Sequence, residues 1–235
     1  MAKTLTEALA EIRDDIDEQT AVHWTEAQLI RYMNRGIEKT ATMSECLRDE
    51  VTKAIVAGTY EYTMSGMDND IIRFTTSKFV RTGDTTEYPL RYYDLLHGMH
   101  EFGSSWQQVS GTPQAFTTWN NPPSLKIKLF PVPAEDGTLT IYYYRKPTLH
   151  ATNGDDNGEN IDLPPGWEAA AVCYARYRAF KFDGQLDQAE LELQEFNDTL
   201  GALSSAATRF TDQPGQVTMV GQAGLPHWLV NDMEW

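Results

Sequence analysis

The chain has 235 residues, of which 41% are hydrophobic and 23% are charged, a composition typical of a folded protein with one large or two small domains. Its formal net charge of -15 excludes a plain nucleic-acid-binding module, because such a module needs a basic face. Two cysteines cannot form a disulfide framework, and without an apolar signal segment or a run of roughly 18 apolar residues we expect a soluble cytosolic protein with no membrane contact.

The first predicted helix covers residues 4–18. Thr4 and Glu7 have the spacing of a capping box, in which each side chain accepts a hydrogen bond from the backbone amide of the other residue. Spacings of four, three and four place the apolar residues on one face, namely Leu5, Leu9, Ile12 and Ile16. We expect this face to be buried.

A second helix is predicted over residues 26–44. Thr25 and Gln28 have the spacing of another capping box, and Trp24 and Leu29 occupy the two positions of a hydrophobic staple. The face expected to be buried contains Leu29, Ile30, Met33, Ile37, Thr40 and Ala41.

From Val51 to Thr148 apolar and polar residues alternate and turn residues are frequent, which is typical of short strands. The candidate strands are residues 50–56, 59–64, 70–77, 85–90, 114–119, 124–130 and 137–145. Residues 92–102 are expected to form a short helix or an irregular crossing. Prolines fall between the strands or at their ends, which suits edges and turns. We predict a compact antiparallel sandwich or barrel of six or seven strands.

Within this region, residues 126–147 are predicted to form a hairpin around Asp136-Gly137. Leu125, Ile127 and Leu129 would share one face of the first strand. The residues expected to match them across the turn are Leu139, Ile141 and Tyr143. The opposite face would carry Lys126, Lys128, Tyr142 and Tyr144, and whether it meets water or a neighbouring protein is left open.

Helical periodicity returns after a polar loop at residues 150–163. One helix is predicted over 166–182, opened by Pro164 and Pro165 and ended by Gly184. Another is predicted over 186–205. Its apolar residues alternate spacings of three and four, as in a helix-packing seam: Leu186, Ala189, Leu193, Phe196, Leu200 and Leu203.

The predicted fold class is therefore α+β. None of the four helices can bury its apolar face alone, so the expected solution is a four-helix bundle with the β-domain inserted between its second and third helices. The expected divisions are residues 1–47 and 164–206 for the bundle, 48–149 for the β-domain, 150–163 for a loop and 207–235 for an extended C-terminal arm.

No motif predicts a catalytic, metal or cofactor site. His97-Gly98-Met99-His100-Glu101 resembles a permuted zinc-protease helix but lacks an evident third ligand. Asp155-Asp156-Asn157-Gly158-Glu159-Asn160 misses the spacing of a calcium loop and favours a surface loop. Cys173, among alanines and tyrosines, is expected to serve packing. We therefore expect a protein that is not an enzyme.

The C-terminal arm differs from a free tail because it contains large apolar side chains. Leu225, Trp228, Leu229 and Trp235 are predicted to anchor it to a neighbouring subunit or another protein, since exposed apolar groups of this size usually mark an interaction site.

Several stretches in this order are similar to tailed-phage head-to-tail adaptor proteins, which are also called connector or neck proteins. They are TLTEALAEIRDDID, WTEAQLIRYMNRGIEKTATMSECLRD, AGTYEY, IKLFPVPAEDGTLTIYYYRKP and LPPGWEAAAVCYARYRAF, and the likeness covers residues 4–205. The resemblance implies a homo-oligomeric ring, commonly twelvefold, that docks on the portal protein and bridges it to tail or nozzle proteins. It also implies passage of genomic DNA without tight binding, a place in the neck of the virion, and assembly in the host cytoplasm.

The last predicted helix carries an acidic face. Asp187, Glu190, Glu195 and Asp198 lie in a segment, Asp183 to Thr208, that contains no Lys or Arg. This face is either a solvated surface or, in a ring, a channel wall that repels the DNA backbone. The alternative function for the whole chain is a tail or fibre-associated binding module that uses its β-domain to recognise a glycan or receptor.

Overall fold

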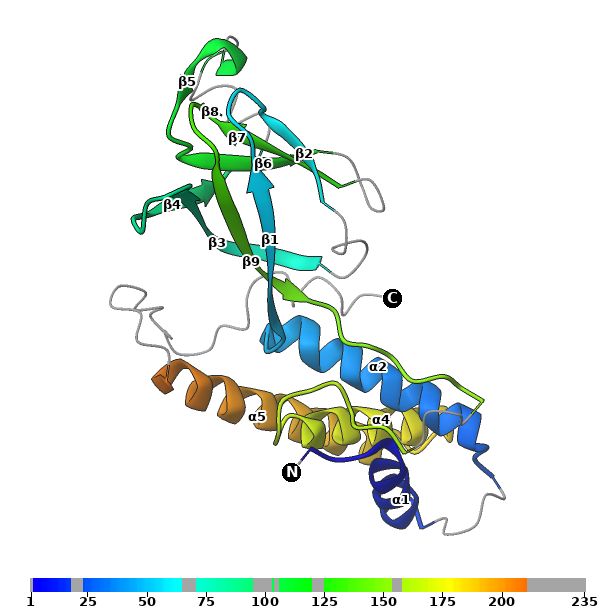
Figure 1. Ribbon diagram of the computed structural model, residues 1–235. Helices are drawn as coiled ribbons and strands as arrows, with labels where there is room; N and C mark the ends of the chain where they lie inside the picture. The colour runs from blue at the N-terminus through cyan, green and yellow to red at the C-terminus, as the bar shows by residue number, and fades with distance from the viewer. Residues whose placement is uncertain are drawn as a thin grey trace.

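The computed structural model describes residues 2–17, 23–64, 71–94, 103, 106–119, 125–153 and 158–210. These residues form four α-helices and a curled seven-stranded sheet, so the predicted α+β class is confirmed. Figure 1 shows the sheet on one side of the molecule and the helices on the other, joined where β1 and β9 meet the end of α2.

The described helices are α1 (Leu5–Asp15), α2 (Glu26–Ser44), α4 (Glu168–Phe182) and α5 (Leu186–Phe210). Helix α4 lies between α2 and α5, which contact each other only slightly, and α1 packs against α2 and α4 (Figure 1). The predicted apolar faces of α1 and α2 are buried in one helical core. The seam of α5 is confirmed at Ala189, Phe196 and Leu200, but Leu186 is 61% exposed because it lies where α5 begins, beside the turn from α4.

The N-terminal capping signals act as predicted. The Glu7 amide donates to Thr4 Oγ1 at 3.3 Å, and the Thr4 amide donates to Glu7 Oε2 at 2.9 Å. The hydrogen bond that the Thr4 amide donates to the Glu7 carboxylate lowers the pKa of Glu7. At α2 the Thr25 amide donates to Gln28 Oε1 at 2.9 Å. Helix α1 ends at Asp15, short of the predicted residue 18.

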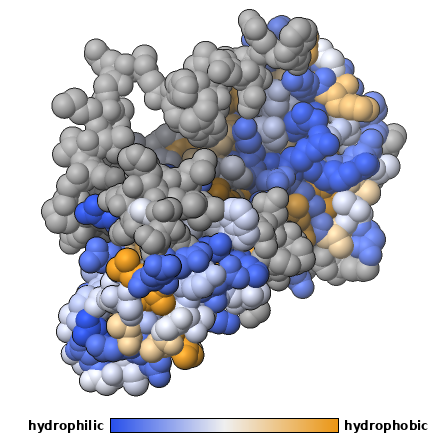
Figure 2. Space-filling view, turned by 90° about the horizontal axis from the view of Figure 1, so that it is seen from above, coloured by the Kyte–Doolittle hydropathy of each residue, from blue (hydrophilic) through white to orange (hydrophobic). Residues whose placement is uncertain are grey.

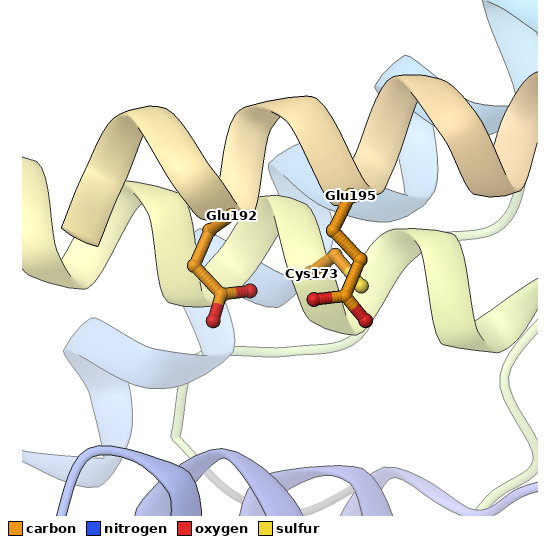
Figure 3. Close-up of side chains that lie close together, drawn as sticks. All are labelled: Cys173, Glu192 and Glu195. Carbon is orange, nitrogen blue, oxygen red and sulfur yellow. The ribbon is translucent and has the colours of Figure 1, made fainter. Parts of the chain in front are cut away.

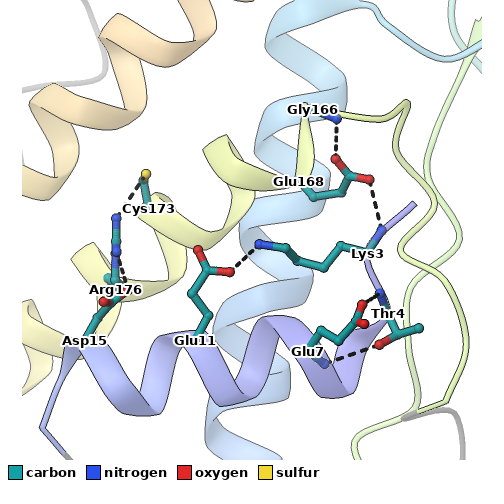
Figure 4. Close-up of polar contacts among 9 residues, drawn as sticks. All are labelled: Lys3, Thr4, Glu7, Glu11, Asp15, Gly166, Glu168, Cys173 and Arg176. Atoms are coloured by element: carbon teal, nitrogen blue, oxygen red, sulfur yellow. Dashed lines mark hydrogen bonds and ion pairs between the residues drawn. The ribbon is translucent and has the colours of Figure 1, made fainter. Parts of the chain in front are cut away.

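Helix α4 begins two residues later than predicted. Pro164 and Pro165 precede it, and the buried carboxylate of Glu168 accepts hydrogen bonds from the amides of Lys3 (3.2 Å) and Gly166 (2.5 Å), as Figure 4 shows. Glu168 thus ties the N-terminal segment to the start of α4. At the other end Gly184 adopts the predicted left-handed conformation with φ 79.

The curled sheet has the order β1-β9-β3-β4-β6-β7-β2. Its strands are β1 (Arg48–Ile55), β2 (Glu61–Thr63), β3 (Ile71–Arg81), β4 (Glu87–Tyr92), β6 (Ala115–Trp119), β7 (Lys126–Phe130) and β9 (Gly137–Arg145). Two short strands, β5 (Ser110–Gly111) and β8 (Val132–Pro133), pair separately. The sheet is curled into a half-barrel, and all its pairings are antiparallel except the parallel pairing of β4 with β6. The predicted antiparallel sandwich or barrel of six or seven strands is therefore confirmed only in part.

The predicted hairpin at residues 126–147 is wrong in its pairing. Strand β7 pairs with β6 and β2, whereas β9 pairs with β1 and β3. The two strands nevertheless bury the predicted faces in one core, which contains Ile127, Leu129, Leu139, Ile141 and Tyr143. Alternation predicts which face a strand buries, but it does not predict which strand lies beside it.

Gly137 was expected to serve a turn, but it is the first residue of β9 and pairs with both Ile55 and Arg81. A Cβ atom on Gly137 would overlap the Phe79 ring and the Val80 carbonyl oxygen. The glycine is therefore required by the close approach of β3 to β9.

The segment after the sheet is partly structured. The Leu5 amide donates to the Glu159 carbonyl and the Ile161 amide to the Lys3 carbonyl, each at 3.0 Å. Ile161 and Leu163 are buried in the helical core. The end of the predicted polar loop therefore pairs with the N-terminal segment.

Candidate functional surface

The acidic face predicted on α5 is largely exposed. Asp187, Glu190 and Asp198 are exposed, and none of them forms an ion pair within the described residues. Their side of the helix is opposite Ala189 and Phe196, which pack in the interior. These three carboxylates define the acidic surface of α5, on which Leu191 is also exposed.

Glu195 differs from the other three predicted residues. Its side chain is 59% exposed, but its Oε2 lies 3.7 Å from Arg176 Nη2. It belongs to the edge of an ion cluster rather than to the open acidic surface.

Arg176 on α4 is the centre of that cluster. Its Nη1 pairs with the Asp15 carboxylate at the end of α1, and its Nε lies 2.8 Å from Glu192 Oε2 on α5. Its Nη2 donates to Cys173 Sγ at 3.3 Å. The Arg176 side chain is only 13% exposed, so this single cation connects three helices in a largely buried place. Figure 4 shows Arg176 between Asp15 and Cys173.

The same cluster brings together three groups able to bind a metal. Ligand atoms of Cys173, Glu192 and Glu195 lie within 4.8 Å of one another. Figure 3 shows the two glutamates of α5 on the side of the helix that faces Cys173 of α4. Burial raises the pKa of the Cys173 thiol, which keeps it protonated and a poor ligand, and burial also raises the pKa of Glu192. Because Arg176 already supplies the positive charge, a structural ion network explains the arrangement better than a metal centre.

The sheet and the helices meet at a second polar centre. Asp162 accepts hydrogen bonds from Arg145 Nη1 (2.6 Å), Arg145 Nη2 (2.8 Å) and the Thr148 amide (2.7 Å). The Arg145 amide donates to the Leu47 carbonyl at 3.0 Å. Close to the end of α2, Arg73 Nη2 lies 2.6 Å from Glu45 Oε2 and forms an ion pair with it. These contacts join the strand that leaves the sheet to the end of α2.

An Asp162→Asn variant is expected to lower the free energy of unfolding by about 1 kcal/mol, because it leaves a charge-assisted bidentate pair incomplete while both side chains keep some contact with water. The hydrogen bond from Arg145 lowers the pKa of Asp162, so its stabilisation is present above the ordinary carboxylate pKa and is lost as pH falls through the lowered value. Urea denaturation across this acidic range should show a shallower pH dependence in the variant. An unchanged pH dependence would contradict this role.

The other predicted residues lie outside the described part of the chain. They are the four arm anchors Leu225, Trp228, Leu229 and Trp235, the whole stretch 97–101, and residues 155–157. The predictions made for them stay predictions.

Exposed aromatic rings on the described part of the sheet do not share one face. Tyr92 packs against Phe74 and Phe116 of the sheet core, with centroids 5.4 Å apart in each case. Trp119 lies under the ammonium group of Lys128 at 4.9 Å and pairs with Lys126 in the neighbouring strand. The one-sided aromatic cluster that a glycan-binding module would need is not formed by these rings.

Sequence reasoning missed Arg176 and Asp162. The sequence does hold a signal that Glu192 needs a cation such as Arg176. Glu192 lies four residues before Phe196, on the side of α5 that packs inward, and a buried carboxylate requires a positively charged partner. Nothing in the sequence near Asp162 indicated that Arg145 would be its partner.

Comparison with known proteins gives one result that spans both parts of the fold. The family model described as SU10 adaptor protein matches residues 3–219. No curated protein matches the chain. Among the helices of the described residues, none is both long and apolar enough to cross a membrane.

Proposed function

Because the chain belongs to the SU10 adaptor protein family, we propose that it is a structural protein of a phage virion that forms a head-to-tail adaptor ring. The observation that carries this proposal is the family match over residues 3–219, which includes the four helices and the whole described sheet. In this proposal the helices act as one bundle, and the sheet is an insertion between α2 and α4.

The proposed ring docks on the portal protein and bridges it to tail or nozzle proteins in the neck of the virion. Assembly takes place in the host cytoplasm, and twelve copies is the proposed number because this is common in head-to-tail adaptors. The chain acts by binding and not by catalysis. Support comes from the Arg176 and Asp162 clusters, whose polar groups are used to hold helices and strands together.

Genomic DNA is proposed to pass the ring without tight binding. The net charge of -15 supports this, since acidic surfaces repel the phosphate backbone. The exposed carboxylates Asp187, Glu190 and Asp198 suit either the channel wall or a contact with a basic surface of another subunit. These uses exclude each other for the same side chains.

The proposal is tested by mixing the purified full chain with the portal ring of the same phage and imaging the product by electron microscopy. We expect a symmetric ring of additional density under the portal. A chain that stays dispersed at assembly concentrations with the portal present would contradict the adaptor function.

The C-terminal arm provides a separate prediction. A Trp228→Ala/Trp235→Ala variant is expected to bind the portal ring at least about 10-fold more weakly, because buried tryptophans commonly dominate interface energy. Co-sedimentation with portal rings measures the effect. The matched control is Trp119→Ala on the sheet surface, which removes one exposed indole from another part of the chain. Equal binding by the double variant and the native chain would contradict the anchoring role.

A further inference from the structure

Helix α2 carries a basic stripe on its outer side. Arg31, Arg35 and Lys39 follow one another at spacings of four, which places them along one side of the helix. Arg31 and Arg35 are exposed, and Lys39 is half-buried. Arg31 Nε donates to the Ala27 carbonyl at 3.1 Å, but none of the three forms an ion pair within the described residues. Glu38 is an acidic residue on the same side.

Helix α5 carries the matching acidic surface of Asp187, Glu190 and Asp198, which also lacks ion pairs within the described residues. Leu191 lies on this side and is 67% exposed. Figure 2 shows, on the face seen from above, that hydrophobic residues form only small separate patches between hydrophilic ones. The outer side of α5 therefore offers three carboxylates and one large apolar side chain, Leu191, to a partner.

The two stripes cannot meet within one chain. Gly36 on the inner side of α2 packs against the Ala171 backbone of α4, and Phe196 on the inner side of α5 packs against Tyr174 of α4 at 5.2 Å between ring centroids. Arg31 and Arg35 on α2 and the three carboxylates on α5 therefore lie on sides that face away from α4, whereas Lys39, three residues after Gly36, lies at the edge of the buried side. At 1.5 Å per residue, Arg31 to Lys39 spans about 12 Å and Asp187 to Asp198 about 17 Å, so their lengths are compatible.

We propose that the acidic surface of α5 in one subunit contacts the basic stripe of α2 in the next copy of the chain. This inference rests on the proposed ring function and names the surfaces through which the ring forms. Different surfaces of the same subunit meet in such a contact, so it is heterologous, and a heterologous contact repeated around an axis closes into a ring. The acidic surface of α5 then faces the neighbouring subunit and does not line the DNA passage.

Charge reversal tests the contact. The double variant Glu190→Lys/Asp198→Lys reverses two charges of the acidic surface of α5. It leaves Asp187 unchanged, because Asp187 lies in the first turn of the helix, where a negative charge is favourable. The double variant Arg31→Glu/Arg35→Glu reverses two charges of the basic stripe of α2. Each variant alone is expected to need a concentration at least about 10-fold higher for ring assembly, because like charges then face each other. Sedimentation velocity and electron microscopy of the full chain, alone and with portal rings, measure assembly.

Two combinations should restore it. An equimolar mixture of the α5-reversed and α2-reversed chains restores opposite charges at every contact when the variants alternate around a ring with an even number of subunits. A single chain carrying all four substitutions restores them for any number of subunits. Both effects should weaken as salt concentration rises.

The matched control is Glu50→Lys/Asp94→Lys, which reverses two exposed charges of the sheet region and should leave assembly unchanged. Circular dichroism melts check that every variant is folded. If the native chain assembles and the α5-reversed chain assembles equally well, the α2–α5 contact is wrong while the ring function stands. If the native chain forms no ring even with the portal, the ring function itself is wrong.

Discussion

An Arg176→Met variant is expected to lose about 3–5 kcal/mol of unfolding free energy, because removing one partner of a buried ion cluster leaves an uncompensated charge. Glu192 has an 18% exposed side chain and would keep its carboxylate beside Cys173 without a cation. Helices α1 and α5 would both lose their ionic contact with α4 at this point. Urea denaturation followed by circular dichroism measures the change.

The matched control is Arg31→Met on the outer side of α2, which should alter the free energy of unfolding by no more than about 0.5 kcal/mol. Adding Glu192→Leu to Arg176→Met should recover most of the loss, since apolar side chains of similar volume can replace a buried ion pair. A double variant as unstable as Arg176→Met would contradict the view that the unpaired carboxylate causes the loss.

The pH dependence of the Arg176→Met variant has an expected sign. Burial raises the pKa of Glu192 in the folded chain, so the folded state takes up a proton at a pH where the unfolded state is still ionised. The cost of the buried charge is therefore full above the raised pKa and disappears as pH falls toward the ordinary carboxylate value. Arg176 also favours the ionised form of Glu192, so removing the guanidinium should raise the pKa of Glu192 further. The gain in free energy of unfolding as pH falls should therefore be larger in the variant than in the native chain.

A Gly36→Ala variant is expected to lose about 3 kcal/mol of unfolding free energy, although alanine favours helices by about 1 kcal/mol over glycine. The new Cβ atom would overlap the Ala171 carbonyl oxygen and approach its carbon atoms. This obstacle is backbone in the first turn of α4 and cannot rotate away, so α2 and α4 would have to separate. Thermal and urea unfolding measure the loss.

Gly201→Ala on α5 is the matched control. Among the described residues, no atom outside the immediate helix backbone lies within 4 Å of the Cβ position at Gly201, so the helix preference of alanine should stabilise the chain by up to about 1 kcal/mol. The two substitutions are chemically identical and are expected to have opposite signs. A stabilised Gly36→Ala variant would contradict the close approach of α2 to α4.

The sequence by itself determined the helices and most of the strands. Capping signals at Thr4 and Thr25 and apolar spacing located α1 and α2, because these signals act between residues a few positions apart. Alternation correctly assigned the buried faces of β7 and β9. The same local signals located the acidic surface of α5, whose residues the structure leaves exposed.

Only the tertiary structure decided which elements meet. Strand β9 pairs with β1 and β3 and not with its neighbour β7, and β4 runs parallel to β6, since alternating sequences fit many partners equally well. Arg176 meets Asp15, which is distant in sequence, and Gly36 meets the backbone of Ala171. Such contacts depend on how α1, α2, α4 and α5 pack in three dimensions, and no spacing along the chain encodes that packing.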